Sequence, residues 1–243
     1  MSKPDDDAVA NTGESANAVV EDAAAAPRRF IFTDGDLQQF LASSAKASLL
    51  KFVSAMGRSC ASVSEFQYDP ENPLKGLSPP MAALHGALTE MLTWVADFPA
   101  EASAAARFGN PRFREWHARW IERFPSILQT VLDINDEYPS GIQEFDAETL
   151  AQAAERGRNA SKVKLEVGEI AGATRRATVV EFSAYSHDAF GHDLRLDYGT
   201  GHESSFQVLL WVLCQIGCFG STSTAPPTPQ RLKAVTISIY SAY

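Results

Sequence analysis

Apolar residues recur at every third or fourth position along much of the chain, which is the repeat of an amphipathic α-helix. The first such stretch predicts a helix that begins with Asp36 as its N-cap and ends near Gly57. A face this regular is typical of a helix that packs on another helix. The expected inward residues are Leu37, Phe40, Leu41, Ala45, Leu49, Phe52, Val53 and Met56.

The same spacing predicts three more helices before residue 140. The second begins at Pro79–Pro80 and ends at Pro99, because proline cannot continue the helical hydrogen-bond ladder. The third begins after Asn110–Pro111, a good N-cap followed by proline, and the fourth begins at Pro125. The expected inward residues of the second helix are Met81, Leu84, Leu88, Met91, Leu92 and Val95. The aromatic face of the third, which we interpret as core, comprises Phe113, Trp116, Trp120, Ile121 and Phe124.

Residues 157–178 interrupt the helical pattern. Polar and apolar residues alternate over 162–167, which is typical of a half-buried strand. We interpret this stretch as an insertion in a helical protein, either a small β excursion near 160–178 or a disordered loop. Helical patterns resume over 179–186 and again at Glu203, so the predicted fold class is all-α.

The composition is that of a globular protein. Of the 243 residues, 45% are hydrophobic and 21% are charged, which is enough for one large domain or two small ones. The formal net charge of −9 argues against binding to nucleic acid or to anionic lipid. No apolar run approaches the roughly 18 residues of a membrane span, so a membrane-spanning protein is not expected. Three cysteines, none in a Cys-x-x-Cys pair, indicate a reduced protein of the cytoplasm or nucleus.

The two ends of the chain differ from its middle. Residues 1–27 carry six acidic residues, one basic residue and no aromatic residue, so we expect a disordered acidic arm. Its Asp5–Asp7 run does not fit a signal peptide. A folded helical domain is expected over residues 28–220. Residues 221–243 begin with a linker-like run of Ser, Thr and Pro, and the alternation over 235–240 predicts an exposed strand.

The most informative polar segment runs from Arg195 to Glu203. Gly199 and Gly201 suit a tight loop with positive φ angles and allow a ligand or another backbone to approach closely. The loop leads into a helix, whose first N–H groups lack intrahelical partners. Together with the hydroxyl of Thr200 and the charge of Arg195, these groups can receive a phosphate or a carboxylate. A plain turn with a helix cap is the alternative, since no Gly-x-x-x-x-Gly-Lys motif is present.

Other chemistries find less support. Asp197, His202 and Ser204 are the residue types of a catalytic triad, but they are neighbours on one loop and no Gly-x-Ser-x-Gly elbow is present. Cys214 and Cys218 lie four positions apart on an apolar helix without a histidine cluster, so we interpret them as buried thiols. No metal site is therefore predicted, and no side chain is assigned as a general acid or base.

Seven of these residues form a specific motif. The string Asp-Tyr-Gly-Thr-Gly-His-Glu at 197–203, preceded by Phe190–Gly191 and Arg195, resembles the signature of the phosphotyrosyl phosphatase activator family. Members of that family activate the type 2A serine/threonine protein phosphatase. A second block over 107–117, which reads Arg-Phe-Gly-Asn-Pro and then Phe-Arg and Trp-His, is similar to another family block. The resemblance runs over about residues 28–219.

The resemblance implies an all-α fold made of a core, a linker and a lid, and it implies peptidyl-prolyl cis–trans isomerase activity. It also implies that ATP with Mg²⁺ binds at the interface with the phosphatase catalytic subunit. The nucleotide-binding residues that it implies are Arg195, Thr200 and Gly201. The residues that would hold the loop and shape the adjoining groove, for the phosphatase or a proline-containing peptide, are Asp197, Tyr198, Gly199, His202 and Glu203.

The chain departs from the family pattern in three places. Ala189 and His192 stand where the family has Ser and Asn, and residues 157–178 lengthen the link between the two blocks. We interpret residues 221–243 as a non-family tail, which stands where the family has a C-terminal part that completes its nucleotide and phosphatase site. Two functions therefore remain open. The first is an active phosphatase activator and prolyl isomerase, and the alternative is a C-terminally truncated, catalytically inactive relative that at most binds a protein partner.

Overall fold

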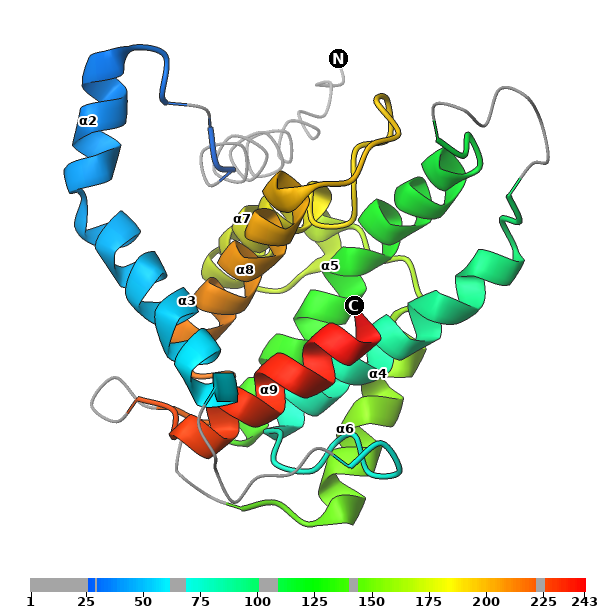
Figure 1. The fold of residues 1–243 in the computed structure, drawn as a ribbon. Helices are drawn as coiled ribbons and strands as arrows, with labels where there is room; N and C mark the ends of the chain where they lie inside the picture. The colour runs from blue at the N-terminus through cyan, green and yellow to red at the C-terminus, as the bar shows by residue number, and fades with distance from the viewer. Residues whose placement is uncertain (1–25, 29, 62–68, 101–108, 140–143, 222–225) are drawn as a thin grey trace, which may run out of the picture.

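The computed structural model describes residues 26–28, 30–61, 69–100, 109–139, 144–221 and 226–243 (Figure 1). The helices are α2 (Asp34–Ala42), α3 (Ser44–Ala61), α4 (Pro79–Thr93), α5 (Phe113–Glu137), α6 (Ala147–Ala160), α7 (Ala173–His187), α8 (Thr200–Gln215) and α9 (Pro229–Ala242). Short 3-10 turns lie at Trp94–Ala96 and Val167–Glu169. No β-strand forms within the described ranges, which confirms the all-α fold class.

Helix α4 lies at the centre of the fold and packs on α5, α6 and α9 (Figure 1). It begins at Pro79, as predicted, and most of its residues are buried. Two glycines bring α4 and α6 together backbone to backbone. A Cβ on Gly86 would lie 2.0 Å from the carbonyl oxygen of Ala154, and one on Gly157 would lie 1.8 Å from that of Ala83. This close contact fixes the spacing of two core helices.

The single helix predicted over residues 36–57 is in fact two helices. Ser43 has an extended backbone, with a ψ of 149°, so α2 ends before it and α3 begins after it. Gly57 does not end α3, which continues to Ala61, because buried side chains before and after the glycine hold the helix against the core.

The cap and the buried face of this region also differ from the prediction. Thr33 is the N-cap of α2, and Asp36 completes a capping box, because its carboxylate accepts from the N–H groups of Phe32 and Thr33. The predicted inward face is buried only towards its C-terminal end, at Phe52 and Met56. No residue of α2 is buried. The first half of the expected hydrophobic face is therefore exposed.

Helix α5 spans both of the helices predicted on either side of Pro125. The prediction of two helices is wrong, because Pro125 lies buried inside one continuous 25-residue helix. Packing on α4, α6 and α7 compensates for the hydrogen bond that proline cannot make. Trp120 and Phe124 are core residues, as predicted, whereas Phe113 and Trp116 are only half-buried.

No strand forms in the described insertion near 160–178. Residues 163–166 form no regular element, and Leu165 packs with Val167 against the helical core. The predicted half-buried strand does not form: Leu165 and Val167 are half-buried, Val163 is 53% exposed, and no second strand lies beside the segment in the described structure. A 3-10 turn and then α7 follow.

The exposed strand predicted over 235–240 is wrong, because this segment belongs to α9. Thr228 caps the first turn of α9, and Pro229 is its first residue. Val235 and Ile239 are fully buried, and α9 packs on α3 and α4 (Figure 1). The helical spacing becomes visible only when the pattern is followed back to Leu232, which is also in the core.

The acidic arm predicted over residues 1–27 falls almost entirely outside the described residues, so it stays a prediction. Among the helices that are described, none combines the length and the apolar character needed to cross a membrane.

Candidate functional site

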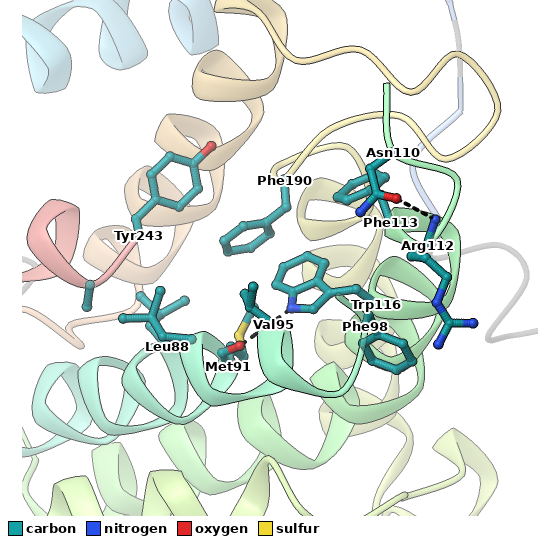
Figure 2. Close-up of a pocket in the computed structure, with 12 residues that line it drawn as sticks. Leu88, Met91, Val95, Phe98, Asn110, Arg112, Phe113, Trp116, Phe190 and Tyr243 are labelled. Atoms are coloured by element: carbon teal, nitrogen blue, oxygen red, sulfur yellow. Dashed lines mark hydrogen bonds between the residues drawn. The ribbon is translucent and has the colours of Figure 1, made fainter. Parts of the chain in front are cut away.

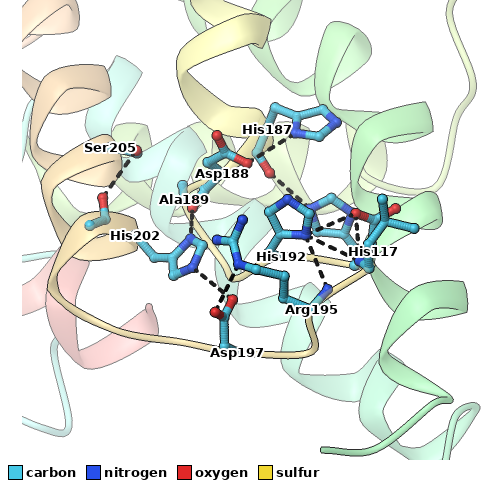
Figure 3. Close-up of polar contacts among 12 residues, drawn as sticks. His117, His187, Asp188, Ala189, His192, Arg195, Asp197, His202 and Ser205 are labelled. Carbon is cyan, nitrogen blue, oxygen red and sulfur yellow. Dashed lines mark hydrogen bonds and ion pairs between the residues drawn. The ribbon is translucent and has the colours of Figure 1, made fainter.

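The two sequence blocks that carry the family resemblance meet in space. The loop of residues 188–199, between α7 and α8, lies against the N-terminal part of α5 (Figure 3). Arg114 Nε donates to the carbonyl oxygen of Asp193 at 2.9 Å. His117 Nε2 lies 2.8 Å from the carbonyl oxygen of His187. Residues far apart in the sequence thereby form one site.

Two glycines set the distance between this loop and α5. Gly109 has a φ of 100°, and a Cβ there would lie 2.6 Å from the carbonyl oxygen of Leu196. Gly191 has a φ of 119°, and a Cβ there would lie 3.0 Å from the ring of Phe113. Each position combines a left-handed backbone with a close neighbour, and glycine alone tolerates both without strain.

The loop closes on itself between His192 and Asp197. The N–H of His192 donates to the carbonyl oxygen of Asp197 at 3.1 Å, and the N–H of Leu196 donates to that of His192 at 2.7 Å. Inside this turn, Nδ1 of His192 accepts from the N–H groups of Leu194 and Arg195 at 3.2 and 3.3 Å. His192 therefore supports the segment that carries Arg195 (Figure 3).

Replacing His192 by leucine is expected to loosen this loop, because the N–H of Arg195 loses its acceptor and the N–H of Leu194 keeps only the carboxylate of Asp193. Each lost hydrogen bond is worth about 1 kcal/mol, so amide hydrogen exchange over 192–197 should become roughly tenfold faster. Asparagine carries an acceptor of similar reach, and His192→Asn should retain slow exchange. Mass spectrometry of the exchanged loop measures both variants, and equally fast exchange in the two would contradict this role.

Asp197 is the charged centre of the loop. Its Oδ2 accepts from Arg195 Nε at 2.9 Å, and its Oδ1 lies 3.6 Å from His202 Nε2. The hydrogen bond from Arg195 lowers the pKa of the Asp197 carboxyl, and His202 adds to this effect. His202 is buried, and its Nδ1 donates to the carbonyl oxygen of Asp188, because a carbonyl can only accept. The ring of Tyr198 stacks on that of His202.

Most of the predicted site residues surround one open cavity of about 520 Å³. Its lining comprises Asp188, His192, Arg195, Asp197, Tyr198, Gly199, Thr200, Gly201, His202 and Ser205. The predicted nucleotide-binding residues therefore lie together with the predicted groove residues. Glu203 is the exception, since it occupies the first turn of α8, as predicted, but does not line the cavity.

Helix α8 begins at this cavity without a side-chain cap. Its first N–H groups have no intrahelical partners, and the helix dipole favours negative charge there. The positive φ angles expected at Gly199 and Gly201 are wrong, because Gly199 is extended and Gly201 lies in ordinary helix. A Cβ on either glycine would meet no atom within 4 Å. The fold does not require these glycines, which leave the cavity open to a group from outside.

One part of the cavity, beside Arg195 and the start of α8, is suited to bind an anion. The side chain of Arg195 is 58% exposed beside Asp197, so its guanidinium can reach a second acceptor. The hydroxyl-bearing Thr200 is exposed at the start of α8. In the described part of the chain, no group of three or more His, Cys, Asp or Glu side chains is placed to hold a metal ion.

The C-terminal segment contributes Tyr243 to this site. Its hydroxyl lies 2.5 Å from that of Tyr198 and donates to the carbonyl oxygen of Ala189. Its ring stacks on Phe206 at 4.0 Å between centroids and lies 4.9 Å from the ring of Phe190. Burial raises the pKa of the Tyr243 phenol. No pattern in the sequence indicates this position, because only the packing of α9 brings the ring to the loop.

An apolar groove of about 300 Å³ lies beside the same aromatic cluster (Figure 2). Phe113 and Trp116, which were predicted as core, line it instead, and Leu92 and Val95 are more than half exposed. The position of both rings inside the second family block is the signal that could have identified them. The full lining is Leu88, Met91, Leu92, Val95, Phe98, Asn110, Arg112, Phe113, Trp116, Phe190, Ala242 and Tyr243.

Comparison with known proteins agrees with these motifs. Residues 27–243 match the family described as "Phosphotyrosyl phosphate activator (PTPA) protein". The chain is 26% identical over 196 residues to "Serine/threonine-protein phosphatase 2A activator 1" of Mycosarcoma maydis. The aligned residues make up 81% of this chain and 32% of that relative. It is 26% identical over 199 residues to "Serine/threonine-protein phosphatase 2A activator 2" of Yarrowia lipolytica, and the aligned residues make up 82% of this chain and 43% of that relative. It is 24% identical over 196 residues to "Probable serine/threonine-protein phosphatase 2A activator 1" of Dictyostelium discoideum, and the aligned residues make up 81% of this chain and 46% of that relative.

The chain thus spans less than half the length of these curated relatives. The family match, in contrast, extends over most of the chain and includes α9. The chain therefore belongs to the family of phosphotyrosyl phosphate activator (PTPA) proteins.

Proposed function

We propose that this chain activates a type 2A serine/threonine protein phosphatase through the surface around Asp197. One observation carries the proposal: the loop of residues 188–199 is braced on α5 and presents the uncapped start of α8 at an open cavity. The relatives are named as phosphatase 2A activators, which supports the same role. The exposed rim of this cavity is the surface that the phosphatase catalytic subunit covers.

ATP is the cofactor that we propose for the cavity. Arg195 and the N–H groups of Thr200 and Gly201 bind its phosphates, as helix N-termini bind anions in general. The uncapped start of α8, the open space beside Gly201 and the exposed guanidinium support this fit. The described residues offer no group of three or more His, Cys, Asp or Glu side chains that could hold Mg²⁺, so the phosphates of a bound nucleotide would supply its ligands. The bound nucleotide supplies phosphate oxygens for the metal at the surface that faces the phosphatase.

Peptidyl-prolyl cis–trans isomerase activity is the second part of the proposal, with the apolar groove as the peptide site. The barrier to rotation about a peptide bond is roughly 18–20 kcal/mol. A binding site lowers it by holding the twisted amide more tightly than either planar form. Phe113, Trp116 and Phe190 supply aromatic faces of the kind on which proline-containing peptides pack. No general acid or base is needed, because the reaction transfers no proton.

Reactivation of a purified, inactive type 2A phosphatase tests the proposal. We expect the 243-residue chain to restore phosphatase activity, and we expect this restoration to require ATP and Mg²⁺. A longer relative serves as the positive control. Restoration without nucleotide would contradict the proposed ATP site. No restoration beside a working relative would contradict the activator function itself.

A chain that binds the phosphatase without activating it is the alternative function. Capture of the purified phosphatase catalytic subunit by the immobilised chain, without reactivation, would identify this alternative.

A further inference from the structure

Tyr243 connects a core helix to the loop of residues 188–199. It directly follows α9 as the C-cap residue, and its N–H donates to the carbonyl oxygen of Ile239. Ile239 and Val235 are both fully buried, so this end of α9 is anchored in the core. The ring of Tyr243 stacks on that of Phe206 in α8. The position of the tyrosine is therefore set by two packed helices.

The hydroxyl of Tyr243 bonds to both ends of the loop. It donates to the carbonyl oxygen of Ala189, because a carbonyl can only accept. A phenol has one hydrogen to donate, so in the 2.5 Å contact between the two tyrosine hydroxyls Tyr198 is the donor. Two hydrogen bonds thus run from Tyr198 through Tyr243 to Ala189. A single oxygen atom on α9 joins the beginning of the loop to its end.

The segment between these two ends carries groups of the proposed nucleotide site. Arg195 and Asp197 lie within it, and they form an ion pair at 2.9 Å. Tyr198 lines the cavity and directly precedes Gly199, the N-cap of α8. Tyr243 does not line this cavity, so it acts on a ligand there only through the loop.

We propose that Tyr243 is a positioning residue for the nucleotide site. Its hydroxyl fixes both ends of the loop to α9, and this holds the guanidinium of Arg195 and the start of α8 in one arrangement, ready for the same phosphate group. The inference rests on the proposed function, because that function makes the cavity a nucleotide site. Phenylalanine at this position would fill the same space and lose only the two hydrogen bonds.

Tyr243→Phe tests the proposal, because it keeps the stacked ring and removes the hydroxyl. The carbonyl oxygen of Ala189 and the hydroxyl of Tyr198 then lose the partner that they share, so the loop should open more often. With two hydrogen bonds lost, amide hydrogen exchange over 192–197 should become roughly tenfold faster. We expect the affinity for ATP with Mg²⁺, measured by isothermal titration calorimetry, to fall about fivefold.

Tyr240→Phe is the matched control, because it removes the same group three positions earlier in α9. Tyr240 also packs edge-on against Phe206, but its hydroxyl accepts from Gln207 in α8. We expect both variants to show a modest loss of thermal stability, whereas loop exchange and nucleotide affinity should change only in Tyr243→Phe. A hydroxyl that serves stability alone would lower Tm and leave the affinity at its parental value in both.

Tyr198→Phe tests the order of the two hydrogen bonds. Because Tyr198 is the donor to Tyr243, this variant leaves the bond to Ala189 in place and should speed loop exchange less than Tyr243→Phe does. In the double variant it should add nothing further. Parental loop exchange or parental ATP affinity in Tyr243→Phe would overturn the proposal. A parent chain that binds no ATP would contradict the proposed cofactor, and loop exchange, which needs no nucleotide, would then decide alone whether Tyr243 positions the loop.

Discussion

The substitution Gly157→Ala is expected to destabilise the protein by about 2 kcal/mol, although alanine is the better helix former. A Cβ at this position of α6 would lie 1.8 Å from the carbonyl oxygen of Ala83 in α4. The helices must move apart, since a backbone atom cannot turn away as a flexible side chain can. Such overpacking costs about 3 kcal/mol, and the gain in helix propensity offsets about 1 kcal/mol of it.

Gly57→Ala is the matched control, because it makes the same chemical change inside α3. A Cβ on Gly57 would meet no atom within 4 Å, so only the gain in helix propensity remains. We expect a stabilisation of up to about 1 kcal/mol. Thermal unfolding measures the stability of both variants, and in a chain of this size each kcal/mol shifts Tm by about 2–4 °C. A rise in Tm for both variants would contradict the backbone contact between α4 and α6.

Much of the helical fold could be predicted because helix signals are local. Pro79 begins α4 as expected, and Glu203 lies in the first turn of α8. The failures involve segments whose structure depends on distant neighbours. Pro125 stays inside a helix because the surrounding helices bury it, and residues 235–240 form a helix because α3 and α4 offer an apolar surface. A six-residue alternation does not distinguish an exposed strand from part of such a helix.

Most residues of the candidate site could be predicted from the sequence, but the contacts that hold them in place could not. The string over 197–203 is contiguous, so it identified the loop and most of the cavity lining directly. The support from Arg114 and His117 and the contact with Tyr243 join residues that are remote in sequence. Local spacing along the sequence does not indicate such contacts. The prediction of a left-handed backbone at Gly199 was also wrong. A Gly-x-Gly pattern occurs both in tight turns and where a ligand approaches the backbone closely, and it does not distinguish the two.

Gly201→Ala is expected to lower the affinity for ATP with Mg²⁺ about tenfold without destabilising the fold. A Cβ at this position meets no atom of the protein within 4 Å, and the residue lies in ordinary helix, so the fold loses nothing. A phosphate that bonds to the first N–H groups of α8, in contrast, must approach the backbone closely, and a methyl group there pushes it away. Isothermal titration calorimetry measures the affinity and thermal unfolding measures the stability.

Ser204→Ala is the control that separates these effects. Ser204 lies in the same part of α8, but its hydroxyl donates to the carbonyl oxygen of Thr200 and its side chain does not line the cavity. We expect its nucleotide affinity to match that of the parent chain. The same two variants should differ in phosphatase reactivation, because the proposed activation depends on the nucleotide. Parental affinity in Gly201→Ala would show that the nucleotide does not bind at the start of α8. A loss of both affinity and stability would instead show that the glycine serves the fold.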